Sequence, residues 1–317
     1  MTSELPVHLV VRHPTTADVR AIFDLIAAAD LADIGEVDYE EGDVVEDLTR
    51  PGLDLDRDYW LVTEGERLMA AASVLNRIGS PTADGELVVH PDADSSVGPH
   101  LLRLLEVRAA GQAAAAGHSS MLVTVPSTTT DTRLAGELAA AGYTAVRRFS
   151  RMVADLGDRP PPLPEAAGRE VRPAAGADDR RAMHAVMTTA FGDHFGSTAE
   201  SYDVWWARQS ARSGFDESLW WLAELDGAVV AGLIGRTMEE QGWVQGLGVL
   251  PAYRGRGLGR RLLLTAFAEF HRRGQPRVGL GVDTGNETGA LVLYESVGMR
   301  RARQHDMWRR TVPAAAE

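Results

Sequence analysis

The feature that most constrains this chain is a strand-like segment, a glycine-rich turn and a helix-like segment in direct succession. Residues 243–250 form an apolar run that predicts a strand, and Pro251 ends it. Residues 254–259, Arg-Gly-Arg-Gly-Leu-Gly, predict a tight turn. Gly274 ends the helical pattern that follows. Its apolar residues recur at helical spacing: Leu262, Leu263, Ala266, Phe267 and Phe270.

Such a turn is suited to bind an anion. The first backbone N–H groups of a helix have no partner inside the helix, and the helix dipole favours negative charge there. Glycines allow the backbone to approach the anion closely. The structural alternative is an ordinary strand-to-helix turn with solvated arginines. Positive charge around the turn comes from Arg254, Arg256, Arg260 and Arg261.

Two common phosphate-binding motifs do not fit. Gly255, Gly257 and Gly259 alternate without the GxGxxG spacing of a dinucleotide-binding loop, and no acidic residue suited to a ribose follows. A P-loop needs a lysine followed by Ser or Thr, whereas all 32 basic residues of this chain are arginine.

The turn does match the pattern Arg/Gln-x-x-Gly-x-Gly/Ala, through Arg254, Gly257 and Gly259. Downstream, residues 286–299 match N-x7-Y-x3-G-F, with methionine in place of the final phenylalanine. In this order, the two motifs resemble the pyrophosphate loop and the following element of the GNAT superfamily of acyl-CoA N-acyltransferases.

The resemblance implies acetyl-CoA as co-substrate and gives roles to the matching residues. The turn would hold the pyrophosphate, and the strand before it would splay so that its backbone binds the pantetheine arm and the thioester carbonyl. Tyr294 is predicted to be the general acid that protonates the departing thiolate, the alternative being a buried helical tyrosine with a satisfied hydroxyl. The predicted cofactor-binding residues are Leu247, Gly248, Val249, Arg254, Gly255, Arg256, Gly257, Leu258, Gly259, Arg260 and Asn286.

The general base is left open by the sequence. Mycothiol synthase, a member of the family, carries a glutamate on the strand before the turn, and this chain has Trp243 at that place. We predict three base candidates. Asp193 and His194 lie in a Phe-Gly-Asp-His-Phe-Gly segment where GNAT enzymes build the acceptor pocket, and Glu224 lies on an earlier predicted strand. A capping Asp, a surface His and a solvated Glu are the structural alternatives.

The chain is also a degenerate repeat. Residues 11–12 match residues 171–172 at an offset of 160, and each half reads strand, helices, three strands, helix, strand, helix, strand. The proline-rich residues 158–168 predict a linker between a domain over 1–157 and a domain over 169–317. We therefore predict an α/β (α+β) fold of two tandem GNAT folds, each a mixed central sheet flanked by helices. This layout resembles that of mycothiol synthase and its relatives.

The first copy lacks the chemistry of the second. Its loop, residues 92–98, lacks the arginines and most of the glycines of the second copy and contains Asp92 and Asp94 instead. These two carboxylates should repel a pyrophosphate. Thr130 and Leu138 stand at the places of the asparagine and the tyrosine of the second copy. We predict that the first domain is non-catalytic; whether it retains CoA binding stays open.

Charge and composition narrow the partners. Residues 1–157 carry a net charge of −13 and residues 158–317 a net charge of 0, so an anionic cofactor should prefer the second half and nucleic acid is not expected. The chain has no cysteine, no HExxH spacing, no leader segment and no apolar run near the roughly 18 residues of a membrane span. We expect no metal, no membrane partner, a cytoplasmic address and a monomer that acts as a tandem pseudo-dimer.

Together these features predict an acetyl-CoA-dependent N-acetyltransferase that acts on a small amine. Direct transfer in a ternary complex is expected, because no nucleophile for a covalent acyl-enzyme stands out. One alternative is mycothiol synthase, which the tandem layout favours and Trp243 disfavours. Another is a catalytically silent CoA-binding regulatory protein, which the intact loop and Tyr294 disfavour. Acetylation of a protein amine is a third.

Overall fold

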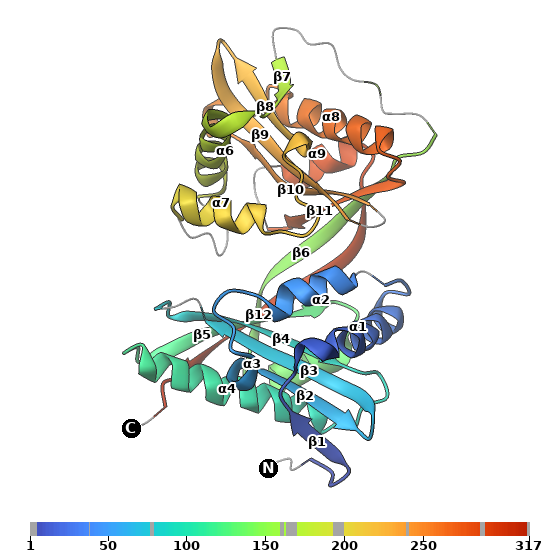
Figure 1. Cartoon of the computed structure of the whole chain (residues 1–317), viewed down its shortest axis with the longest axis vertical. Coiled ribbons are helices and arrows are strands. Elements are labelled where there is room, and N and C mark those ends of the chain that lie inside the picture. Colours follow the sequence, from blue (N-terminus) through green and yellow to red (C-terminus); the bar gives the residue numbers. More distant parts are fainter. Residues whose placement is uncertain are drawn as a thin grey trace. The chain divides into compact units, whose positions relative to one another are not determined.

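The chain folds into two compact units (Figure 1), formed by Met1–Arg148 with Gln304–Glu317 and by Phe149–Arg303. Each unit is a mixed sheet flanked by helices, which confirms the predicted fold class. The computed structural model describes residues 5–37, 39–76, 79–158, 162, 170–192, 200–238, 241–285 and 289–315.

The first half of the chain begins and ends with a strand. Its elements are β1 (Leu9–Arg12), the 3-10 helix η1 (Thr16–Asp18), α1 (Val19–Asp33), α2 (Glu41–Leu48), α3 (Leu55–Asp58), β2 (Tyr59–Glu64), β3 (Arg67–Asn76), β4 (Thr82–Val89), α4 (Val97–Ala115), β5 (Ser120–Thr128), α5 (Thr132–Ala140) and β6 (Thr144–Asp155). This order agrees with the pattern predicted for each half.

The second half repeats the order. Its elements are β7 (Glu170–Pro173), α6 (Gly176–Phe191), α7 (Tyr202–Ser210), η2 (Glu217–Leu219), β8 (Trp220–Leu225), β9 (Ala228–Thr237), β10 (Gly242–Val249), η3 (Pro251–Tyr253), α8 (Leu258–Arg272), β11 (Arg277–Asp283), α9 (Ala290–Ser296) and β12 (Arg300–Pro313). The predicted helix after the glycine-rich turn is confirmed as α8, and its five predicted apolar residues are all buried.

Helices cover both faces of each sheet, and the strand sequences show why. In β2, Leu61 packs with α1 and α2, while its neighbour Val62 packs with α4 and α5. In β8, Leu222 packs with α6 and α7, while Trp221 packs with α8 and α9. Successive side chains of a strand point to opposite faces, so a strand buried on both faces is apolar throughout.

Each unit is completed by a strand from the other half of the sequence. β6 pairs antiparallel with β11, with Phe149 opposite Asp283, and β12 pairs antiparallel with β5, with His305 opposite Thr128. The compact units therefore do not follow a division of the chain at residues 158–168. Of that proline-rich segment, the structure describes Asp158 and Pro162.

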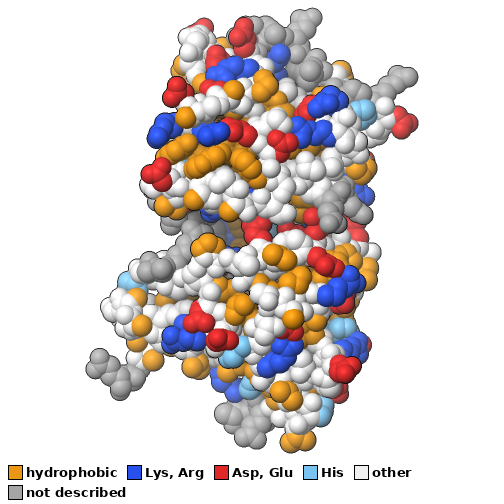
Figure 2. Space-filling view, viewed as in Figure 1, with side chains coloured by type: hydrophobic (Ala, Val, Ile, Leu, Met, Phe, Trp, Pro, Cys, Tyr) orange, Lys and Arg blue, Asp and Glu red, His pale blue; other side chains and the backbone are white. Residues whose placement is uncertain are grey.

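In the second half of the chain, whose net charge is 0, basic and acidic side chains lie next to one another. Figure 2 shows basic and acidic side chains interspersed on the visible face of the second unit. Arg180 pairs with Glu217 at 2.7 Å, and Arg208 pairs with Glu200 at 2.6 Å. A surface arginine paired with a carboxylate adds little to the local positive potential. The potential at an anion-binding site therefore depends on the arginines at that site.

Candidate functional site

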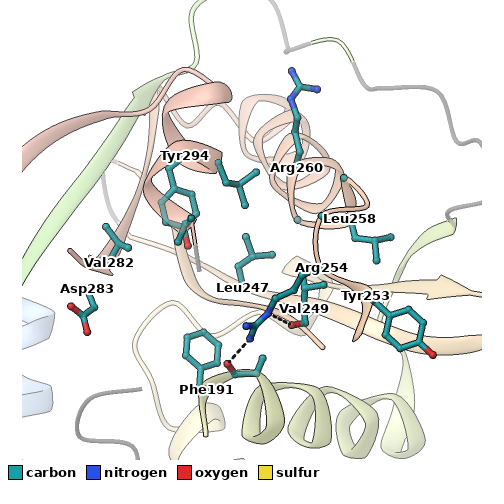
Figure 3. Close-up of a pocket in the computed structure, with 18 of the residues that line it drawn as sticks. Phe191, Leu247, Val249, Tyr253, Arg254, Leu258, Arg260, Val282, Asp283 and Tyr294 are labelled. Atoms are coloured by element: carbon teal, nitrogen blue, oxygen red, sulfur yellow. Dashed lines mark hydrogen bonds between the residues drawn. The ribbon is translucent and has the colours of Figure 1, made fainter. Parts of the chain in front are cut away.

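A cavity of about 530 Å³ opens in the second unit between β10 and β11 (Figure 3). The two strands run parallel and are paired over residues 242–243 of β10. Farther along, β10 lines the cavity through Leu247 and Val249, and β11 lines it through residues 281–283. The strands therefore diverge ahead of the glycine-rich turn, and the backbone of β10 faces the space between them.

β10 is irregular where this divergence begins. Its register with β9 shifts between Val244 and Gly246, so that Gln245 forms a bulge. The equivalent strand of the first unit, β4, keeps a regular register with β3 from Ala83 to Val89. A bulge bends a strand and redirects its side chains, so the two copies differ at the place where the cavity forms.

The glycine-rich turn leads directly into α8. Gly255 and Gly257 have φ values of +73° and +78°, a region that costs a residue with a side chain about 1–2 kcal/mol. Gly257 is the N-cap of α8, and Gly257, Leu258, Gly259 and Arg260 all line the cavity. The free N–H groups of the first helical turn lie at this wall, together with the positive end of the helix dipole. The arrangement can bind a diphosphate.

Two other predicted glycines are explained by packing. A Cβ atom at Gly259 would lie 3.0 Å from Cδ2 of Leu293, so a glycine there lets α8 approach α9. A Cβ atom at Gly248 would lie 3.0 Å from Cβ of Ala190 on α6. Gly248 therefore faces α6, whereas its neighbours on β10 face the cavity.

The arginines of the turn have backbone partners. Arg254 donates from Nε to the carbonyl of Val249 at 3.2 Å and from Nη2 to the carbonyl of Ala190 at 3.4 Å (Figure 3). It thereby ties the turn to the end of β10 and to the negative C-terminal end of α6. Arg256 stacks over the ring of Tyr253, 5.4 Å from its centroid. Among the described lining residues, Arg254 and Arg260 are the arginines.

Tyr294 lies on α9 with its ring at the cavity wall. The side chain is 8% exposed, and burial raises the pKa of its phenol to about 12. The hydroxyl accepts or donates no hydrogen bond within the described parts of the chain. A phenol with a raised pKa stays protonated at neutral pH, so it can donate a proton to a group that enters the cavity.

Asp283, which ends β11, and Phe149, which lies on β6, line the cavity but were not among the predicted site residues. Phe191, which ends α6, also lines it and opens the Phe-Gly-Asp-His-Phe-Gly segment predicted at the acceptor pocket. Asp283 is 8% exposed and its Oδ1 accepts from the N–H of Gly285 at 2.9 Å. From the sequence we expected no acidic residue suited to a ribose after the loop, but the strand that follows α8 does end on an acidic residue, Asp283. No local signal could have identified Phe149, because its strand comes from the other half of the repeat.

The base candidates have different positions. Glu224 accepts from Nε of Arg172 at 2.7 Å, and Arg172 also pairs with Asp179. Glu224 is thus held in an ion-pair network between β7 and the start of α6, and it is absent from the described lining residues. This structural role argues against Glu224 as the base. Asp193 and His194, like Asn286 of the predicted cofactor-binding set, lie outside the described residues.

Comparison with known proteins identifies the family. Residues 181–299 match the family model described as Acetyltransferase (GNAT) family. A mycothiol acetyltransferase of Thermomonospora curvata is 36% identical over 225 residues, which cover 69% of this chain and 71% of the relative. The chain belongs to the GNAT acetyltransferase family. A mycothiol acetyltransferase of Nocardiopsis dassonvillei is 32% identical over 280 residues, covering 76% of this chain and 78% of the relative.

Solved structures share the fold along nearly the whole chain. A GCN5-related N-acetyltransferase from Sphaerobacter thermophilus superposes with a TM-score of 0.85 at 29% identity, over 99% of both chains. A tandem GNAT protein from the clavulanic acid biosynthesis pathway has a TM-score of 0.67 at 19% identity, over 97% of this chain and 100% of that chain. The second likeness concerns the fold alone. Together they confirm the prediction of two tandem GNAT folds.

Membership of the family makes the chain an N-acyltransferase, and GNAT acetyltransferases use acetyl-CoA as co-substrate. Over the described ranges, no group of three or more His, Cys, Asp or Glu side chains is arranged to hold a metal ion. A search of the same residues finds no helix with the length and apolar character needed to cross a bilayer.

Proposed function

We propose that this cavity is the active site of an acetyl-CoA-dependent N-acetyltransferase that acts on a small amine by direct transfer in a ternary complex. The observation that carries the proposal is that the N-terminus of α8 and Tyr294 line one cavity. The helix end supplies donors for a diphosphate, and the tyrosine supplies a neutral phenol for a leaving thiolate.

In the proposed reaction, the N–H groups at residues 257–260 hold the diphosphate of acetyl-CoA, with Arg254 and Arg260 nearby. The diverging backbone of β10 binds the pantetheine arm along Leu247 and Val249. The amine nitrogen of the acceptor attacks the thioester carbon, and the C–S bond breaks. Tyr294 donates its proton to the departing thiolate, while the amine loses a proton to a base and the tyrosine is later reprotonated by solvent.

Asp193 and His194 remain our proposed bases for this step. They follow Phe191, a lining residue, by two and three positions. The segment therefore starts at the cavity wall, although its own residues are outside the described ranges. The chain has no cysteine to form an acyl-enzyme, which favours direct attack by the amine.

Mycothiol synthesis is a second candidate, because the relatives at 36% and 32% identity carry the name mycothiol acetyltransferase. Trp243 weighs against it. The indole lies against Gly279, whose Cβ would be 2.8 Å from Cζ3 of the ring, and the guanidinium of Arg151 lies 5.0 Å from the ring centroid. This residue therefore has a packing role where the resemblance leads us to expect a catalytic glutamate.

We propose that the first unit does not bind acetyl-CoA productively. Glu137 of α5 places its carboxylate against Gly98, in the first turn of α4. Arg133 pairs with Glu137 at 3.2 Å and donates to the carbonyls of Ala93 at 3.2 Å and Asp94 at 3.0 Å. An arginine and a carboxylate of the chain itself thus occupy the turn where a diphosphate would bind.

The same position in the second unit is apolar. There, Leu293 of α9 contacts Gly259 in the first turn of α8 and lines the cavity. The residue that follows it is Tyr294, whereas the residue that follows Glu137 is the fully buried Leu138. Both the anion-binding turn and the proton donor of the second unit therefore lack a counterpart in the first.

The test is consumption of acetyl-CoA with a panel of primary amines that includes the unacetylated form of mycothiol, followed by chromatography. Chromatography avoids interference from acceptors that carry a thiol. We expect at least one amine to support turnover, and the Gly257→Val variant to lose it. If the protein binds acetyl-CoA but consumes it with none of the amines, the alternative of a catalytically silent regulatory protein would be favoured.

A further inference from the structure

One face of the β6–β11 pair lies at the cavity and differs in chemistry from the cofactor wall. In the antiparallel register, Phe149 stands opposite Asp283, and Arg151 stands opposite Gly281. Residues two apart on a strand share a face, and directly opposed residues share it across the pair. Phe149, Arg151, Gly281 and Asp283 therefore form one surface, of which Phe149, Gly281 and Asp283 line the cavity.

Gly281 leaves this surface open. A Cβ atom built at Gly281 would meet no described atom within 4 Å, whereas a Cβ atom at Gly279 would lie 2.8 Å from the ring of Trp243. Packing thus explains Gly279 but not Gly281. Gly281 is exposed in the middle of β11. A glycine inside a strand weakens the strand, and it often marks a place where a ligand approaches the backbone.

Asp283 places a carboxylate on the part of this surface that lines the cavity, whereas Arg151 is absent from the described cavity lining. Asp283 is the one carboxylate among the described residues that line the cavity, and it is 8% exposed. The hydrogen bond from the N–H of Gly285 at 2.9 Å fixes the orientation of the carboxylate. In Figure 3, Asp283 lies at the left of the view and Arg260 near its top, while the guanidinium of Arg254, the other arginine among the described lining residues, lies near Phe191.

We propose that Gly281, Asp283 and the aromatic side chains of Phe149 and Phe191 form the acceptor subsite. Asp283 would bind the ammonium form of a primary amine, and the two rings would contact an apolar group carried next to it. Asp283 is thus a specificity-determining residue for cationic acceptors. A carboxylate in a mostly buried site binds an ammonium group through a charge-assisted hydrogen bond. A ligand with a neutral hydroxyl in place of the ammonium group forms a weaker hydrogen bond with the same carboxylate. As a role in acetylation, the inference rests on the proposed function.

The experiment measures binding rather than turnover. The full-length protein, saturated with CoA, is titrated by calorimetry with phenethylamine as a cationic probe and with phenethyl alcohol as its neutral counterpart. The Asp283→Asn variant keeps an oxygen that can accept from Gly285 but loses the charge. We expect it to weaken phenethylamine binding by at least about tenfold, as loss of a hydrogen bond to a charged group predicts, and to leave phenethyl alcohol binding within about twofold.

Asp155→Asn is the matched control. Asp155 lies at the other end of the same strand pair, opposite Arg277, and is absent from the described cavity lining. This variant removes the same charge from the same sheet, and we expect both probes to bind as they do to the wild type. Equal losses in both variants, or phenethylamine affinity unchanged in Asp283→Asn, would overturn the proposal.

A second variant tests the open space. In Gly281→Leu the Cβ atom would meet no described atom within 4 Å and the rest of the side chain would enter the cavity, so the variant should fold and should weaken both probes by at least about tenfold. Unchanged binding of both probes would contradict the subsite. These outcomes are independent of the reaction: if no amine is acetylated but Asp283→Asn still weakens phenethylamine selectively, the proposed function fails and the subsite stands. If an acceptor is found, Asp283→Asn should raise its KM more than it lowers kcat.

Discussion

Replacing Tyr294 with phenylalanine removes one hydroxyl from the cavity wall and should lower kcat by about 100- to 10,000-fold, the range for a single positioned proton donor. That range corresponds to about 3–5.5 kcal/mol of transition-state stabilisation. The folded state should not suffer, because no described group forms a hydrogen bond with the hydroxyl and the ring remains buried. The expected effect is therefore confined to the chemical step.

The assay separates binding from chemistry. With acetyl-CoA and an active amine both saturating, kcat should fall, while the Kd for acetyl-CoA measured by calorimetry should stay within about twofold. Tyr253→Phe is the matched control, because Tyr253 is a second tyrosine at the wall of the same cavity. It should leave kcat unchanged. A kcat of Tyr294→Phe equal to that of the wild type would remove Tyr294 from the mechanism.

The same burial predicts an effect on stability at high pH. The pKa of Tyr294 is raised to about 12 in the folded chain, whereas an unfolded tyrosine titrates near ~10. The folded state thus binds more protons between these values, so its stability is fully present below pH ~10 and falls as pH rises toward ~12. In urea unfolding, the free energy of unfolding of the wild type should fall by up to about 3 kcal/mol relative to that of Tyr294→Phe between these pH values. Parallel pH curves would contradict the burial of the phenol.

Three further outcomes follow from the structure. Gly257→Val should abolish acetyl-CoA binding, whereas Gly274→Val, at a similar φ of +80° beyond the other end of α8, should lose comparable stability and keep binding. Calorimetry should find one tight acetyl-CoA site per chain, and two equivalent sites would contradict the blocked turn of the first unit. Asp58→Ala should reduce the free energy of unfolding by about 3–5 kcal/mol in urea, because Asp58 is 3% exposed and accepts from Arg108 at 2.6 Å. The nearby exposed Asp56→Ala should change it by no more than about 0.5 kcal/mol.

The parts of the fold that could be predicted are those that short stretches of sequence specify. Helical periodicity and flanking glycines defined α8, and the apolar run ended by Pro251 defined β10. The repeat of element order gave the two copies. The exchange of β6 and β12 between the two units could not be predicted. The alternation of apolar and polar residues along a strand shows which side chains are buried, but it does not show which strand pairs with it.

For the site, too, only the features set by local sequence could be predicted. The motif spacing predicted that the glycine-rich turn and Tyr294 belong to one site, and both line the cavity. Spacing could not show that Arg254 bonds to two backbone carbonyls, since those partners lie on β10 and α6. Nor could it separate Gly281 from Gly279, because their difference is the position of the Trp243 ring. Features that depend on contacts between distant segments required the structure.

The most direct test of the account is an experimental structure of the full chain bound to acetyl-CoA. We predict that the diphosphate lies within hydrogen-bond distance of the backbone N–H groups at residues 257–260, and that the thioester sulfur lies beside the hydroxyl of Tyr294. A diphosphate bound at the turn before α4 in the first unit, or a thioester outside the cavity between β10 and β11, would contradict it.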